Sequence, residues 1–209
     1  MRALAALALL AATATPAAAE RPGDFDFYVL SLSWSPSYCE AEGNDRAAAE
    51  CAGGRPYAFV VHGLWPQYER GFPADCDSPD WPSRRAVDAM TDVMPDPGLV
   101  RHEWRKHGTC SGLGPDAYFA TLRAARAKVT IPDAFRRLST YLTTTPAAIE
   151  RAFLAANPAI KADGIAVTCD RRRLREVRVC LTPSLDFRAC GEVDRRACDQ
   201  SKVVLPPVR

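Results

Sequence analysis

Five short stretches of the chain have the composition and patterning of β-strands. Asp24 to Trp34 alternates its apolar side chains and contains neither Gly nor Pro, and Tyr57 to Val61 is a second apolar run. Ile165 to Cys169 and Leu174 to Leu181 resemble a strand pair joined by a turn, and a last strand is expected near Val203 to Leu205. Strands are therefore predicted toward both ends of the chain.

Apolar residues at helical spacing predict helices in the middle of the chain. Three segments begin with a proline, which is compatible with the first position of a helix: Pro115 to Val129, Pro132 to Leu142 and Pro146 to Ala156. A shorter helix is predicted from Arg84 to Met94. Gly71 to Ser83 should be loop, because it holds three prolines.

The order of these elements predicts a mixed α+β domain rather than a regular repeat of strand, helix and strand. Ser37 to Gly54 is polar and rich in Ala, and fits either a helix or a loop. No repeat or low-complexity linker divides the chain of 209 residues. We expect residues 20–209 to form a single domain with a substantial core.

The first nineteen residues have the pattern of a secretory signal peptide. Arg2 precedes an apolar run from Leu4 to Ala12, and Ala17 to Ala19 supplies small residues before Glu20. The apolar run is too short to span a bilayer, and no other stretch approaches about 18 consecutive apolar residues. The sequence therefore predicts an exported protein, periplasmic or secreted, that does not reside in a membrane.

Eight cysteines, an even number in a chain expected to be exported, indicate four disulfides. Eight cysteines allow about 105 pairings, among which the sequence alone does not choose. The formal net charge is only +2 at pH 7, which argues against affinity driven by a large polybasic surface. A local cleft that binds phosphate remains compatible with this charge.

The segment from Asp96 to Cys110 contains two of the three histidines of the chain. Asp96 fits the N-cap of a short helix, and Gly108 fits the left-handed residue that commonly ends one. Four titratable side chains share one face of this helix, within an arc of about 140°: His102, Glu103, Lys106 and His107. A salt-bridged surface helix is the alternative, but it has little use for two histidines and a Trp in so few positions.

The third histidine, His62, stands at the end of the second predicted strand, a position that is well placed for a site. Gly63 and Pro66 predict a sharp turn, which would leave Trp65 and Tyr68 near the same rim. Taken alone, His62 could be a hydrogen-bonded core histidine, and either aromatic residue could belong to the core.

Two histidines that titrate near neutrality can act as general base and general acid in one turnover. A neighbouring Lys with a further His or Glu could hold an anion whose charge grows in the transition state. This set suits phosphoryl transfer without a metal or other cofactor. RNA supplies its own nucleophile in the 2′-hydroxyl, so that cleavage would give a 2′,3′-cyclic phosphate, whereas DNA would be inert.

A zinc hydrolase is the rival interpretation of the same residues. Metalloprotease helices carry their histidines at i and i+4, about 40° apart, whereas His102 and His107 are five positions apart, about 140°. A regular helix could not readily present both to one ion, and Lys106 would repel a cation. We therefore expect no metal site.

Two long motifs resemble the active-site segments of the ribonuclease T2 family of secreted acid ribonucleases. They are His62-Gly63-Leu64-Trp65-Pro66 and His102-Glu103-Trp104-Arg105-Lys106-His107-Gly108-Thr109-Cys110. The lack of an N-glycosylation sequon and the Ala-rich signal favour the bacterial periplasmic branch of this family. The strand ending Leu32-Ser33-Trp34-Ser35-Pro36-Ser37-Tyr38-Cys39 and the cysteine-rich close of the chain are also similar. The resemblance implies a central antiparallel sheet flanked by helices and stapled by disulfides.

The resemblance also implies roles for individual residues. His107 would be the general base on the 2′-hydroxyl, and His62 the general acid toward the 5′-leaving oxygen. His102 would bind phosphate, while Glu103 and Lys106 would stabilise the non-bridging oxygens of the transition state. The base 5′ to the cut would bind at Trp65, Gln67 and Tyr68, with Trp65 stacking on it. The implied disulfides are Cys39–Cys51, Cys76–Cys110, Cys169–Cys198 and Cys180–Cys190.

Two departures from the family pattern concern base preference. Ser33 stands where many members carry Gln, and Gln67 stands where some relatives carry an Asp that reads adenine, so weak base discrimination is expected. We therefore expect a monomeric endoribonuclease of low base specificity that acts on single-stranded RNA and leaves 3′-phosphates as end products. The alternative is a non-catalytic extracellular protein that keeps the same fold for binding RNA or for another interaction.

Overall fold

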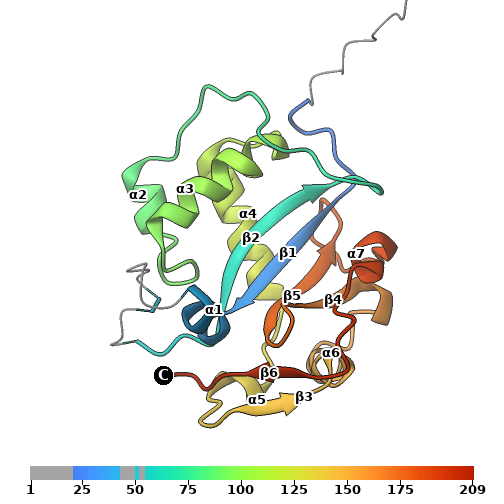
Figure 1. Ribbon diagram of the computed structural model, residues 1–209. Helices are drawn as coiled ribbons and strands as arrows, with labels where there is room; N and C mark the ends of the chain where they lie inside the picture. The colour runs from blue at the N-terminus through green and yellow to red at the C-terminus, as the bar shows by residue number, and fades with distance from the viewer. Residues whose placement is uncertain (1–20, 43–49, 52–54) are drawn as a thin grey trace, which may run out of the picture.

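The computed structural model describes residues 21–42, 50–51 and 55–209 (Figure 1). Its main sheet is antiparallel and has the strand order β2-β1-β5-β4. From one edge to the other, the strands are β2 (Phe59–Gln67), β1 (Phe27–Trp34), β5 (Leu174–Leu181) and β4 (Ile165–Cys169). A second antiparallel pair joins β3 (Leu142–Thr144) to β6 (Val203–Leu205). The expected α+β class is thus confirmed.

Helices lie around the main sheet and connect its strands (Figure 1). They are α1 (Ser35–Glu42), α2 (Arg84–Asp88), α3 (Pro97–Lys106), α4 (Pro115–Lys128), α5 (Asp133–Arg136), α6 (Pro146–Ala156) and α7 (Gly191–Arg195), with short 3₁₀ turns η1 (Gly108–Ser111) and η2 (Ala162–Gly164). Three of the helices, α3, α4 and α6, begin with a proline, as expected where the backbone N–H would lack a partner.

The two faces of the main sheet differ in what they pack against. Alternate β1 residues from Tyr28 to Trp34 point into the main core, where Tyr118 and Leu122 of α4 cover them. Figure 1 shows α4 crossing behind β1 and β2. On the opposite face, Phe27 and Val29 belong to a small separate cluster. That face is left largely free for polar groups.

The helix predicted from Pro132 to Leu142 is wrong over most of its length. Only Asp133–Arg136 is helical, and Arg137 leaves the helical region with φ −140° and ψ 47°. Leu142 instead pairs with Leu205 of the last strand. A spacing of apolar residues that fits a helix can equally serve a turn and a strand, and here a distant partner strand decided the outcome.

Other elements also end at residues different from those predicted. The helix predicted from Arg84 to Met94 ends at Asp88, and the chain continues in turns that still bury Met90 and Met94. Within Ser37 to Gly54, helix α1 reaches Glu42. Residues 43–49 and 52–54 lie outside the described part of the chain, as does the predicted signal peptide.

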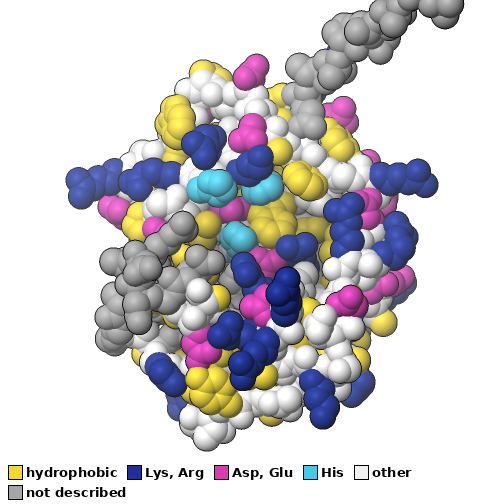
Figure 2. Space-filling model, viewed as in Figure 1, with side chains coloured by type: hydrophobic (Ala, Val, Ile, Leu, Met, Phe, Trp, Pro, Cys, Tyr) yellow, Lys and Arg dark blue, Asp and Glu magenta, His cyan; other side chains and the backbone are white. Residues whose placement is uncertain are grey.

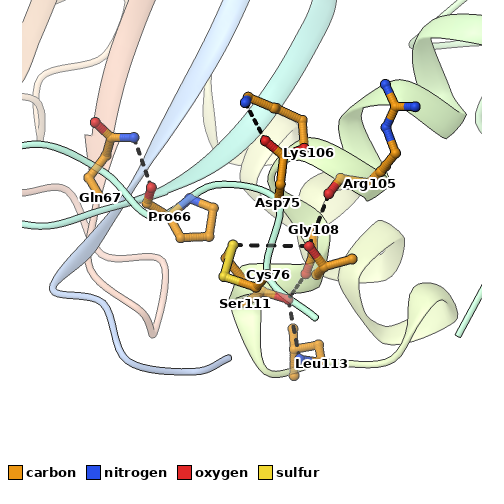
Figure 3. Close-up of a disulfide and its surroundings, with 11 residues drawn as sticks. Pro66, Gln67, Asp75, Cys76, Arg105, Lys106, Gly108, Ser111 and Leu113 are labelled. Carbon is orange, nitrogen blue, oxygen red and sulfur yellow. Dashed lines mark hydrogen bonds and ion pairs between the residues drawn. A yellow bond between two sulfur atoms is a disulfide. The ribbon is translucent and has the colours of Figure 1, made fainter. Parts of the chain in front are cut away.

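Four disulfides link the chain, and they are the four pairings that the resemblance implies: Cys39–Cys51, Cys76–Cys110, Cys169–Cys198 and Cys180–Cys190. The second joins the loop after β2 to the turn that follows α3 (Figure 3). Within the ranges described above, no helix is both long and apolar enough to cross a bilayer.

Candidate active site

His62 occupies a β-bulge inside β2. Ser31 of β1 pairs with Gly63 and Leu32 pairs with Val61, which leaves His62 between them without a partner on β1. Bulges bend a strand and re-aim a side chain. The predicted end of the strand at Val61 and the sharp turn after it are therefore wrong, because the strand continues through the bulge to Gln67.

Helix α3 delivers the second group of candidate residues. Asp96 caps its first turn by accepting a hydrogen bond from the Gly98 amide at 2.7 Å. Glu103 is almost completely buried, with 1% of its surface exposed, whereas His102 is exposed. His107 is the C-cap, with φ −127° and ψ −43°, so it lies beyond the regular helical face on which the sequence pattern placed it.

Gly108 has a different role from the one predicted. The left-handed glycine of this region is Gly112, with φ 73°, at the end of η1. A Cβ atom on Gly108 would lie 2.5 Å from Trp104 and 3.0 Å from Tyr118. Gly108 is therefore needed for the close packing of two buried aromatic rings beneath the site.

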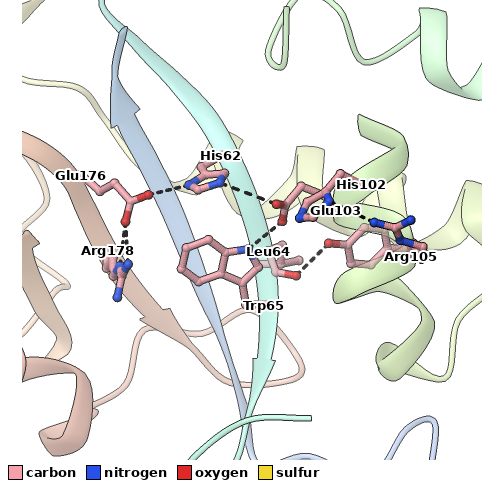
Figure 4. A network of polar contacts seen from close by, with 9 residues as sticks. His62, Leu64, Trp65, His102, Glu103, Arg105, Glu176 and Arg178 are labelled. Atoms are coloured by element: carbon pink, nitrogen blue, oxygen red, sulfur yellow. Dashed lines mark hydrogen bonds and ion pairs between the residues drawn. The ribbon is translucent and has the colours of Figure 1, made fainter. Parts of the chain in front are cut away.

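The side chain of Trp65, on β2 with His62, reaches toward Glu103 of α3 (Figure 4). Its indole Nε1 donates a hydrogen bond to Glu103 Oε2 at 2.7 Å. Its ring centroid is 5.2 Å from that of His62 and 5.3 Å from that of His107. Both histidine rings thus contact the same indole ring, which the buried carboxylate of Glu103 anchors.

A second carboxylate reaches His62 from β5. Glu176 Oε1 lies 2.5 Å from His62 Nδ1, while Glu103 Oε1 lies 3.7 Å from His62 Nε2. Arg178 donates two hydrogen bonds to Glu176 Oε2, at 2.9 and 2.7 Å. The Arg178 guanidinium carbon also lies 5.0 Å from the Trp65 ring centroid, which is cation–π range.

These contacts shift the pKa values of His62, Glu176 and Glu103 in different directions. Burial lowers the pKa of His62, but the hydrogen bond and charge of Glu176 outweigh it, so the net shift is upward. Burial alone would raise the pKa of Glu176, yet its contacts with His62 and Arg178 lower it to about 2. Burial raises the pKa of Glu103 to about 7. At neutral pH the Glu176 carboxylate is therefore ionised, whereas the Glu103 carboxyl group titrates close to neutral pH.

His107 is shifted in the opposite direction from His62. Burial and the nearby positive groups His62, Lys106 and His102 lower the pKa of His107 to about 3. Its Nδ1 atom is buried and makes no hydrogen bond to the described part of the chain. Between about pH 3 and the raised pKa of His62, the site therefore holds one neutral and one protonated imidazole.

Lys106 is held beside the cavity by the loop after β2. Its Nζ lies 2.5 Å from Asp75 Oδ2, and its carbonyl accepts a hydrogen bond from the Asp75 amide at 2.9 Å (Figure 3). His102 Nδ1 lies 3.4 Å from an Arg105 nitrogen. Figure 2 shows the three histidine side chains gathered around a hydrophobic patch on one face of the molecule.

A cavity of about 280 Å³ opens beside these groups. Three residues predicted to bind substrate line it, namely Trp65, Gln67 and Tyr68, as do Lys106 and His107. The remaining lining comes from residues that the sequence analysis did not select: Phe27, Gly71, Phe72, Arg178, Glu192, Val193 and Arg196. Apolar walls beside cationic groups suit a base attached to a phosphate.

Glu176 and Arg178 are the principal site residues that sequence reasoning missed. The available signal was a pair of opposite charges at alternate positions of the predicted strand, since both residues lie on the same face of Leu174–Leu181. Among the described residues, no three His, Cys, Asp or Glu side chains are grouped in a way that could hold a metal ion.

Comparison with known proteins identifies the family of the chain. The sequence model of the Ribonuclease T2 family matches residues 25–190. A ribonuclease of Aeromonas hydrophila is 34% identical over 90% of this chain and 88% of that protein. Ribonuclease I of Escherichia coli is 31% identical over 57% of this chain and 61% of that protein.

Two solved structures of similar fold are named as an RNase or as RNase-related. RNase NT in complex with 5′-AMP is 26% identical, with a TM-score of 0.62 over 88% of this chain and 99% of that one. The RNase-related protein from Calystegia sepium has a TM-score of 0.72 at 20% identity, over 88% and 98% of the two chains, and supports the fold. The chain therefore belongs to the ribonuclease T2 family and is an RNA-cleaving enzyme.

Proposed function

We propose that the protein is an endoribonuclease of low base specificity that cleaves single-stranded RNA by metal-independent transphosphorylation. His107 removes the proton of the 2′-hydroxyl, and the resulting oxyanion attacks the adjacent phosphorus. His62 protonates the departing 5′-oxygen. A 2′,3′-cyclic phosphate forms, and water then opens it to a 3′-phosphate with the two histidines in exchanged roles.

The observation that carries this proposal is the opposite shift of the two pKa values across one indole ring. A general base must start neutral, and burial with surrounding positive charge lowers the pKa of His107 to about 3. A general acid must start protonated, and Glu176 raises the pKa of His62. Because Nδ1 of His107 is buried, Nε2 is the nitrogen that would take the proton.

The remaining groups have roles that suit their surroundings. Lys106 and His102 supply positive charge for the phosphate. Glu103, whose pKa is near 7, can carry a proton in mildly acidic solution and donate it to a non-bridging oxygen. Trp65, Gln67 and Tyr68 line the cavity and would receive the base 5′ to the cut. Arg178 covers part of the Trp65 ring, so stacking would use the rest of the indole.

The proposed setting is an exported monomer. Four disulfides are typical of an oxidising compartment, and the pattern of the first nineteen residues is that of a signal peptide. Sedimentation of the purified protein would test the monomer, and N-terminal sequencing of protein from the periplasm or the medium would test export. A mature chain that begins near Glu20 is expected.

The test uses the oxidised protein with single-stranded RNA and with DNA of the same sequence, in excess EDTA. Cleavage of RNA alone is expected. Intact RNA, or cleavage that requires a divalent metal, would refute the proposal. The His107→Ala variant should lose turnover by at least about 100-fold while it retains RNA binding, since one proton-transfer group contributes about 10²–10⁴. Unchanged turnover would refute the assignment of the base.

A further inference from the structure

The contact between His62 and Glu176 spans the central strand of the sheet. Ser31 and Ser33 of β1 lie between them in the pairing register, with Arg178 opposite Ser31 and Glu176 opposite Ser33. Serine side chains are too short to fill the space above β1. Long side chains from β2 and β5 can therefore meet over this strand.

We propose that Glu176 is a positioning residue for His62 and that Arg178 clamps Glu176, so that β5 sets the orientation and charge of the general acid. Neither residue lies in the two histidine motifs. This inference rests on the proposed function, because it assigns the source of the protonated His62 in that mechanism.

The geometry fixes which nitrogen of His62 can act. Glu176 occupies Nδ1 at 2.5 Å, so the Nδ1 proton stays on the imidazole and Nε2 is left for the substrate. The nearest carboxylate oxygen to Nε2 belongs to Glu103 and lies 3.7 Å away, beyond hydrogen-bond distance. Nε2 is therefore free to donate to the leaving oxygen.

Arg178 holds the carboxylate in place from its other side. Both of its hydrogen bonds go to Oε2, which leaves Oε1 for His62. Glu176 is almost fully buried, so an unpaired charge there would be costly, and the Arg178 guanidinium balances it. The same guanidinium lies over Trp65, so it connects the clamp to the wall of the cavity.

Charges around His62 come from several elements. They are Glu176 and Arg178 on β5, Glu103 on α3, His107 after α3, and Glu50 near the end of the segment that follows α1. The two carboxylates Glu176 and Glu103 favour the protonated imidazole, and Arg178 disfavours it. The 2.5 Å contact with His62 still holds Glu176 after Arg178 is removed, so removal of Glu176 and removal of Arg178 should move the titration of His62 in opposite directions.

A purely structural ion pair between β5 residues is the competing explanation. In that case both substitutions would lower stability, and neither would move a titration specific to His62. A loss of packing alone would not shift the pKa of His62 in opposite directions in the two variants. The pair of variants therefore separates positioning from packing.

The experiment follows His62 by NMR of ¹⁵N-labelled histidine in the intact, oxidised protein without RNA. The chain has only three histidines, so His62→Ala, His102→Ala and His107→Ala identify the signals. Glu176→Gln should lower the pKa of His62 by about 1 unit or more, because an opposite charge in contact shifts a pKa by about 1–3 units. Arg178→Gln should raise it.

The same variants are assayed for kcat/KM against pH. The alkaline limb should move to lower pH in Glu176→Gln and to higher pH in Arg178→Gln, while the acid limb, which belongs to His107, stays in place. Arg175→Gln removes a charge at an exposed position of the same strand that does not line the cavity, and it should leave both limbs unchanged. Thermal unfolding of each variant confirms that folded protein is compared.

Unshifted His62 titration, or shifts of the same sign in both variants, would overturn the inference. If wild type leaves RNA intact in EDTA, the proposed function fails, and the NMR titration still decides whether Glu176 and Arg178 control His62. If wild type cleaves RNA and the titration does not respond, the proposed function stands and the positioning role is refuted. The two failures are thus distinguishable.

Discussion

Replacing Cys76 and Cys110 together by alanine removes the disulfide that fastens the loop after β2 to the end of α3. The loop carries Asp75, which is held in a left-handed conformation with φ 51° and binds both the side chain and the carbonyl of Lys106. Without the tether, Asp75 can relax and Lys106 loses its restraint. The double variant should therefore lose both stability and activity.

The expected loss of stability follows from the length of the closed loop. Cys76 and Cys110 are separated by 34 positions, for which chain entropy gives about 3.8 kcal/mol at 25 °C. Cys169 and Cys198 are separated by 29 positions, which gives about 3.6 kcal/mol. The Cys169→Ala/Cys198→Ala double variant is therefore a control of similar loop length, and neither of its cysteines adjoins Asp75 or Lys106 in the sequence.

Urea unfolding of the wild type and both double variants measures the stability change, and kcat/KM on single-stranded RNA measures the site. Both variants should lose about 3–4 kcal/mol. Below both unfolding midpoints, only Cys76→Ala/Cys110→Ala should lose activity, by about 10-fold to 100-fold, as for a misplaced charge near a reacting phosphate. Equal activity in the two variants would refute the positioning role of the tether, and a loss below about 1 kcal/mol would refute the entropy argument.

Three further predictions concern the centre of the site. Gly63→Ala should destabilise the protein by about 2 kcal/mol in urea unfolding and reduce activity. The added Cβ would lie 2.1 Å from Glu103 Oε2 and 2.3 Å from Trp65 Nε1, and unchanged stability would show that both side chains can move aside. Inorganic phosphate should raise the pKa of His107 from about 3, measured by NMR, because a bound anion offsets the positive groups around it; an unchanged pKa at saturating phosphate would exclude binding there. Glu103→Gln should gain stability relative to wild type as pH rises. The pKa of Glu103 in the folded protein, about 7, lies above its ordinary value of 4.5, so wild type loses stability as pH rises from 4.5 through 7. The difference in unfolding free energy between variant and wild type should change by about 3 kcal/mol over this range, and a constant difference would contradict the assignment.

Local patterning determined much of the fold. The strands Ile165–Cys169 and Leu174–Leu181 and the helix Pro146–Ala156 have the predicted boundaries, because alternation or helical spacing in each is reinforced by turn residues or a proline at its start. The failed helix from Pro132 shows the limit of this signal. Its apolar spacing was compatible with a helix, but pairing with the last strand of the chain is invisible locally.

The site was predictable to the extent that its chemistry is concentrated in sequence. All three histidines lie in the two segments that the fold brings together around Trp65. The bulge at His62 could not be foreseen, because it is defined by the register of β2 against β1. Glu176 could not be foreseen either, since it stands 114 positions from His62 and reaches it only through the pairing of β5 with β1.

The most direct test of the mechanism uses a DNA oligonucleotide that contains a single ribonucleotide, incubated with the oxidised protein in excess EDTA. Attack by the 2′-hydroxyl predicts one cut, directly 3′ to the ribonucleotide, with a 2′,3′-cyclic phosphate on one product and a 5′-hydroxyl on the other, both identified by mass spectrometry. An all-deoxy oligonucleotide should remain intact. A 5′-phosphate product, cleavage of the all-deoxy strand, or a requirement for added metal would contradict the mechanism.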